Sequence, residues 1–111
     1  MGAVMYTSVG HVPTAAGDVF TATTALGSSI SLIQITNNLA SNRTVTVSIS
    51  ADNGSNYYNI ATSIVVPPST AVGILTGTLN LTLNSRIRMI DSTSGAVATD
   101  CDYIISCFNY S

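Results

Sequence analysis

A segment near the middle of the chain alternates strictly between apolar and hydroxyl-bearing side chains. In Arg43–Ala51, every second residue from Val45 onward is apolar, and each residue between them is threonine or serine. A period of two is typical of a β-strand that has one face in a core and the other in water. β-Branched and small polar residues dominate the rest of the chain, while lysine and glutamate are absent. The sequence therefore predicts an all-β protein.

Segments of this kind recur along the chain at roughly 8–12-residue spacing, with turn-forming clusters between them. Strands are expected at 4–12, 19–24, 29–36, 43–51, 57–61, 63–66, 71–75, 78–84, 86–89 and 102–110. A chain of 111 residues has room for one domain. We expect a single-domain antiparallel β-sandwich over residues 1–111, jelly-roll-like and of about eight to nine strands. Residues 1–12 are either its first strand or an extended arm.

The alternation also predicts which side chains face the core. Inward positions are expected at Val45, Val47, Ile49, Ala51, Leu79, Leu81, Leu83, Ile87 and Met89. Two other strands are apolar on both faces. In 29–36, Ile30 and Leu32 are expected opposite Ile33 and Ile35. Strand 102–110 has the same character, with Tyr103, Ile105 and Cys107 on one face and Ile104, Phe108 and Tyr110 on the other.

Two packed sheets can cover only one face of each strand. We therefore expect at least one of these apolar faces to be buried against another subunit. The candidate protein contacts in the last strand are Tyr103, Ile105, Phe108 and Tyr110.

The chain carries very little charge. Only 7% of its residues are charged, the net charge is −2, and the three arginines are its only lysine or arginine residues. Strong electrostatic binding of nucleic acid needs many more basic side chains. Disorder is disfavoured by the 46% apolar content. No run of about 18 apolar residues predicts a membrane span. No basic segment followed by an apolar run predicts a signal peptide.

Residues able to carry catalysis do not form a recognisable constellation. His11 is the only histidine, and no serine lies in a nucleophile-elbow motif. Cys101 and Cys107 would lie about 20 Å apart on one strand, too far for a disulfide, and are expected to be buried small apolar residues. The sequence therefore predicts no catalytic residue, no metal site and no cofactor.

The acidic residues are expected to have structural rather than catalytic roles. Asp91, Asp100 and Asp102 are expected at surface turns or strand ends rather than as a catalytic pair. The segment Asp52–Asn56 has a faint resemblance to a calcium loop, but its Asn-Gly step is a strong hairpin-turn signal. We expect a turn there, with a weak ion site as the alternative.

Arg86 and Arg88 lie two residues apart and so share one strand face. They are either two solvated side chains or a paired contact to carboxylates of a neighbouring protein. Arg43 opens a different strand and is expected on the surface. Tyr57 and Tyr58 are adjacent, so one of them should face the core and the other could meet a partner or a sugar.

The order of these segments resembles that of a known protein class over nearly the whole chain. The segments that carry the resemblance are Gly17–Thr21, Ile35–Asn38, Arg43–Ile49, Tyr57–Ile60, Val65–Pro68, Leu79–Leu83, Arg86–Met89 and Tyr103–Ser106. In this order they resemble the small all-β virion structural proteins of tailed bacteriophages.

The resemblance implies a non-enzymatic role in a virion that is assembled in the bacterial host cytoplasm. The favoured role is a capsid decoration or cement protein that binds the outer capsid surface and stabilises the head. Its implied partners are the major capsid protein or other virion proteins, and further copies of itself, with a trimer favoured. The alternatives are a neck, tail or fibre component of the same particle, or a carbohydrate-binding β-sandwich with no virion role.

Overall fold

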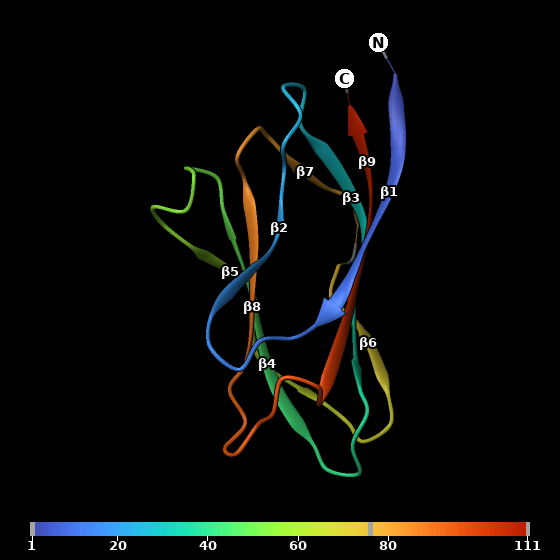
Figure 1. The fold of residues 1–111 in the computed structure, drawn as a ribbon, viewed down its shortest axis with the longest axis vertical. Coiled ribbons are helices and arrows are strands. Elements are labelled where there is room, and N and C mark those ends of the chain that lie inside the picture. Colours follow the sequence, from blue (N-terminus) through green and yellow to red (C-terminus); the bar gives the residue numbers. More distant parts are fainter. Residues whose placement is uncertain (1, 76, 111) are drawn as a thin grey trace.

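The chain forms two antiparallel β-sheets that pack face to face (Figure 1). This computed structural model describes residues 2–75 and 77–110; Met1, at the start of the predicted 1–12 segment, Thr76 and Ser111 lie outside the described residues. Within the described part, no helix is long and apolar enough to cross a membrane. The strands are β1 Ala3–His11, β2 Gly17–Thr21, β3 Ser28–Asn37, β4 Arg43–Ser50, β5 Tyr58–Val66, β6 Ala71–Gly73, β7 Leu79–Leu81, β8 Arg86–Asp91 and β9 Cys101–Tyr110.

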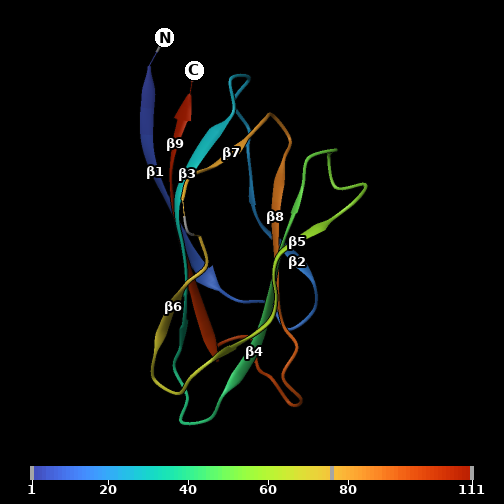
Figure 2. The same ribbon diagram turned by 180° about the vertical axis from the view of Figure 1, so that it is seen from behind.

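The first sheet has the order β1-β9-β3-β6, with β7 also pairing with β3, and the second has the order β2-β8-β4-β5. The first four strands therefore alternate between the sheets along the chain. Figure 2 shows the same two layers from behind, with β5 and β6 on different layers. The predicted all-β antiparallel sandwich of eight to nine strands is confirmed.

The hydrophobic core lies between the central strands of the two sheets. Val45 and Val47 of β4 and Ile87 and Met89 of β8 are fully buried, as the alternation predicted. Ile49 pairs with Ile87 and packs against the same core while partly buried. Ala51 lies beyond the end of β4 and is exposed, so its predicted inward position is wrong.

Strand β3 does not divide its isoleucines between two faces, as the sequence had suggested. Its register against β9 shifts between Ile30 and Leu32, which marks a β-bulge. One extra residue reverses the alternation that follows. Ile30, Ile33 and Ile35 are consequently all fully buried, while Leu32 is 36% exposed on the outer side. The prediction of two apolar faces is therefore wrong for this strand.

Two further strand predictions are corrected by local backbone geometry. The expected strand 78–84 is much shorter, because β7 ends at Leu81 and a turn follows that ends at Asn84 with a φ of 67°. Leu83 is 45% exposed in this turn instead of facing the core. The expected strands 57–61 and 63–66 are one strand, β5, which continues through Ser63 with a φ of 47°.

Residues Ala3–His11 of the N-terminal segment form a strand of the first sheet. β1 pairs with β9 along its whole length, from Ala3 opposite Tyr110 to His11 opposite Asp102. Figure 1 shows β1 at the outer edge of its sheet, beside β9. The other edge of β1 has no partner strand among the described residues.

Three charged residues that were expected on the surface are buried. Arg43, Asp91 and Asp100 are 9%, 2% and 7% exposed. Nη2 of Arg43 lies 3.2 Å from Oδ2 of Asp100. That carboxylate also accepts a hydrogen bond from the backbone N–H of Val97, at 2.9 Å. The surface prediction failed because the ion pair joins residues far apart in the sequence, at the start of β4 and just before β9.

Candidate interaction surface

The outer side of the β1–β9–β3 sheet carries exposed apolar side chains on three neighbouring strands. Cross-strand pairing places Met5 beside Phe108 and Val9 beside Ile104. Met5 is 79% exposed, Val9 65% and Phe108 38%. We call the five residues Met5, Val9, Leu32, Ile104 and Phe108 the outer apolar face. Thr7 and Ser106 pair between these two apolar pairs, and Leu32 lies beside Ser106. Exposed apolar side chains gathered on one face commonly mark a site of protein contact.

The structure separates the predicted contact residues of β9 into two groups. Phe108 is exposed and Tyr110 is half-buried, and both lie on the outer side of the sheet, opposite Met5 and Ala3. Tyr103 is only 9% exposed and Ile105 is fully buried, because alternate residues of β9 point into the sandwich. Tyr103 and Ile105 therefore belong to the core of this chain, and their prediction as surface contacts is corrected.

A histidine–carboxylate pair lies at one end of the outer apolar face. Nδ1 of His11 is 2.6 Å from Oδ1 of Asp102, and Nδ2 of Asn38 donates to Oδ2 of the same carboxylate at 3.0 Å. The hydrogen bond from Asn38, followed by the contact with His11, lowers the pKa of Asp102. Catalysis by such a pair needs a nucleophile on the other side of the imidazole. Among the described side chains, none is hydrogen-bonded to the other imidazole nitrogen of His11, Nε2.

The two outward arginines of β8 already have a carboxylate partner in their own chain. Nη1 of Arg86 lies 3.3 Å from Oδ2 of Asp18, and Nε of Arg88 lies 3.6 Å from Oδ1. Tyr57 donates its hydroxyl hydrogen to Oδ1 at 2.7 Å, and the Arg88 guanidinium lies 3.6 Å from the centre of the Tyr57 ring. A carboxylate on another protein would have to compete with Asp18 for these groups. Contact of Arg86 and Arg88 with a neighbouring protein remains a prediction.

This cluster controls the ionisation of Asp18. Burial raises the pKa of Asp18, but the hydrogen bonds from Tyr57 and Arg86 and the charge of Arg88 outweigh it and hold the pKa below its ordinary value. The same hydrogen bond to Asp18 raises the pKa of Tyr57. The network is thus most favourable when Asp18 is ionised and Tyr57 is neutral.

The substitution Asp18→Asn should therefore reduce the acid sensitivity of the fold. A carboxyl whose pKa is lowered in the folded state stabilises it above the unfolded pKa, and this contribution is lost as the pH falls through the folded pKa. The side chains are about one-third exposed, so we expect a difference of about 1 kcal/mol or less. Urea denaturation at neutral pH and near pH 3 measures it. Equal losses of stability in the variant and the wild type would contradict the assignment.

The segment Asp52–Asn56 is a turn, as predicted. Asn53 and Gly54 both have positive φ angles, of 60° and 85°. The carboxylate of Asp52 accepts hydrogen bonds from the backbone N–H and side-chain amide of Asn56, at 2.9 and 2.8 Å. These hydrogen bonds lower the pKa of Asp52 to about 2. Across residues 2–75 and 77–110, no three histidine, cysteine or acidic side chains gather as a metal site.

The two cysteines are buried free thiols, as expected. Burial and the neighbouring carboxylate of Asp91 raise the pKa of Cys101 to about 11, and burial raises the pKa of Cys107. Reactive cysteines have lowered pKa values, so neither thiol has the character of a nucleophile.

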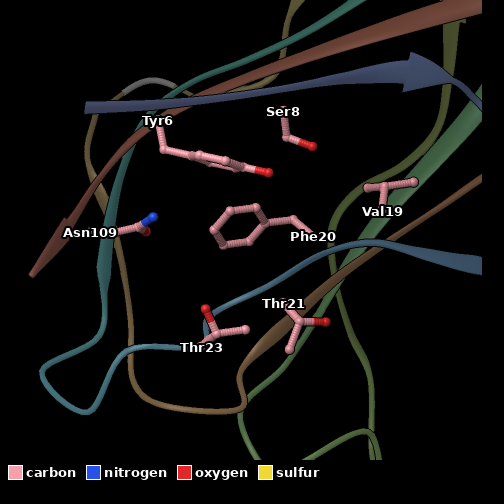
Figure 3. A pocket seen from close by; sticks show the side chains of 7 residues that line it. All are labelled: Tyr6, Ser8, Val19, Phe20, Thr21, Thr23 and Asn109. Carbon is pink, nitrogen blue, oxygen red and sulfur yellow. The ribbon is translucent and has the colours of Figure 1, made fainter. Parts of the chain in front are cut away.

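A pocket that the sequence did not reveal opens between the edges of the two sheets. It has a volume of about 260 Å³, and Figure 3 shows the rings of Tyr6 and Phe20 at its centre. Their ring centres are 6.3 Å apart with an angle of 50° between the planes. The remaining lining residues are Ser8, Val19, Thr21, Thr23 and Asn109. The two rings come from β1 and β2, on different sheets, so only the tertiary structure brings them together.

Comparison with known proteins finds similarity of fold alone. No protein-family model matches the chain, and no curated protein matches it significantly. Among solved structures, it resembles a chain of the T13 particle of infectious bursal disease virus, with a TM-score of 0.55 and 12% identity. That match covers 97% of this chain and 31% of the viral chain. A chain of the Gt strain of the same virus matches at a TM-score of 0.46 and 13% identity, over 97% of this chain and 30% of that one. The protein therefore spans less than a third of these viral chains and shares the fold of that part of the T13 particle chain.

Proposed function

We propose that this protein is a non-enzymatic structural component of a virus particle. The observation that carries the proposal is the likeness in fold, over 97% of the chain, to part of a chain from a virus particle. The strand order supports it, because the alternation of β1 to β4 between two sheets suits a jelly-roll sandwich, an architecture common in viral capsids. Fold alone does not specify function, so the surface has to support the role as well.

Within this class, we propose a capsid decoration protein of a tailed bacteriophage. This finer proposal rests on the resemblance of the sequence to small phage virion proteins, whereas the virus of the structural comparison is not a tailed phage. Under this finer proposal, the protein is assembled into the virion in the bacterial cytoplasm. The outer apolar face, with Tyr110 beside it, would rest on the major capsid protein. The five residues of the outer apolar face are uncharged, so no charged group among them would lose its hydration when this face contacts the capsid protein.

The test uses phage heads that lack the protein. Adding purified protein should raise the melting temperature of the heads, because a ligand that binds only the assembled shell stabilises it. Phe108→Asp should abolish this effect, since it places a charge in the outer apolar face, directly opposite Met5. Tyr58→Asp is the matched control, because Tyr58 is 70% exposed on the other sheet. Heads that neither bind the wild-type protein nor gain stability from it would contradict the decoration role.

The pocket in Figure 3 favours a second candidate, a carbohydrate-binding β-sandwich. Aromatic rings with hydroxyl and amide groups around them are suited to contact with sugars. Two results together would establish this candidate over the virion role. The protein would bind a glycan and lose that binding in Tyr6→Ala, and it would not bind heads. The third candidate function is that of a neck, tail or fibre component. The position of the protein on the particle would distinguish this role from that of a head protein.

A further inference from the structure

We propose that the free edge of β1 pairs with β1 of a second copy, antiparallel and across a two-fold axis, so that one sheet runs through both chains. The pairing is independent of the virion role, because it depends only on the edge of this sandwich. It differs from the trimer that the sequence resemblance favours.

The regularity of β1 distinguishes it from the other sheet edges among the described strands. β1 has nine residues and pairs with β9 without a register shift. β6 and β7 have three residues each. β2 has a register shift between Asp18 and Phe20, and β5 has shifts near Val47 and a positive φ at Ser63. Short or irregular edges resist the addition of a strand, whereas a long regular edge accepts one.

The side chains of β1 also favour a partner. Ala3–Gly10 contains no charged residue and no proline, which are the usual means of protecting an edge. Val4 is 64% exposed, Met5 79%, Tyr6 49% and Val9 65%. Successive residues of a strand point to opposite sides, so β1 exposes apolar surface on both sides of its sheet. A paired strand would cover part of each.

The length of β1 selects one register for a symmetric pair. When the two-fold axis passes through Thr7, all nine residues of Ala3–His11 are paired. Met5 then lies opposite Val9 of the second copy, and Tyr6 lies opposite Ser8. The Met5–Val9 pairs fall on the outer side and join the outer apolar faces of the two copies into one surface.

A second copy is the occupant that this edge fits best. The edge from Ala3 to Gly10 has no charged residue and can meet its own copy without like-charge repulsion, and the symmetric register pairs Met5 with Val9. In an isologous pair, each copy covers the free β1 edge of the other, so assembly stops at two chains. The other edges are short or irregular and would not extend the sheet into a filament.

Sedimentation or light scattering of the purified protein at micromolar concentration gives the first test. We expect twice the chain mass of 11.4 kDa. Thr7→Cys should then form a disulfide-linked dimer on mild oxidation, because directly opposed residues of antiparallel strands lie about 4.5–5.5 Å apart at Cα. Thr62→Cys, an exposed position on β5, is the control that should stay uncrosslinked. A monomeric wild type would overturn the pairing, as would equal crosslinking of the two variants.

A charge exchange tests the register itself. Met5→Lys with Val9→Lys places like charges opposite each other and should abolish the dimer, while Met5→Lys with Val9→Asp should restore it. Val65→Lys with Val97→Lys adds the same charge at exposed positions away from β1 and should leave the dimer intact. Circular dichroism checks that each variant is folded. A dimer that survives the two β1 lysines, or is not restored by the Lys–Asp pair, would overturn the proposed pairing. A dimer of the predicted register that fails to bind heads would contradict the decoration role and leave the pairing standing.

Discussion

Replacing Arg43 with methionine is expected to lower the free energy of unfolding by about 3–5 kcal/mol, which is the usual cost of removing one partner from a buried ion pair. The Arg43 and Asp100 side chains are each 10% exposed, and their charged atoms lie 3.2 Å apart. Methionine fills much of the same volume but leaves the mostly buried carboxylate of Asp100 without its countercharge.

The surroundings make this loss larger than the pair alone would suggest. Burial is the main cause of the raised pKa of Cys101. The charges of Asp91 and Asp100 raise this pKa further and the charge of Arg43 lowers it, so all four groups share one environment. Without Arg43, two buried carboxylates would remain there with no neighbouring cation among the ion pairs of the described residues.

Arg88→Met is the matched control for this substitution. Arg88 also pairs with an aspartate, Asp18, but its side chain is 36% exposed and the separation is 3.6 Å. An ion pair in contact with solvent contributes about 1 kcal/mol or less. Urea denaturation of both variants gives the comparison, and similar losses of stability would show that Arg43 is not buried as described. Arg43→Met combined with Asp100→Asn should recover part of the loss.

The substitution Ile105→Ala should lower the free energy of unfolding by about 2–5 kcal/mol, whereas Ile104→Ala should cost distinctly less. Ile105 is fully buried, so its removal leaves a cavity between the two sheets. Ile104 is the preceding residue of β9, points to the outer side and is only partly buried. The two variants delete the same atoms from opposite faces of one strand, which makes each the control for the other.

Urea midpoints measured on both isoleucine variants test this assignment of faces. A larger loss for Ile104→Ala would mean that the register of β9 is displaced by one residue. It would also return Ile105 to the set of surface contacts that the sequence had suggested.

The sequence predicted strands best where one strand alternates without a bulge. In β8, Ile87 and Met89 face the core and Arg86 and Arg88 face outward, as the period of two requires. The same argument failed in β3, because the bulge beside Leu32 depends on pairing with β9 and has no clear local signal. A period of two identifies a strand but does not show where its partner forces an extra residue.

The polar contacts were predictable only when they were local. The turn at Asn53 and Gly54 follows from adjacent residues with a known preference for positive φ. By contrast, the hydrogen bond from Tyr57 to Asp18 spans 39 residues, and the one from Arg86 to Asp18 spans 68. The pairing between β2 and β8 and the turn after β4 bring these groups together, so their intramolecular use could not be seen in the sequence.

The central claim, a structural role in a virus particle, is tested most directly by electron cryomicroscopy of particles from the source lysate. If the protein decorates the capsid, we expect regularly spaced density on the outer surface of the heads, and the β-sandwich of residues 2–75 and 77–110 should fit into it. Density confined to the neck, tail or fibres would keep the virion role and contradict the position on the capsid. Particles that contain no such density, and from which the protein is absent, would contradict the claim.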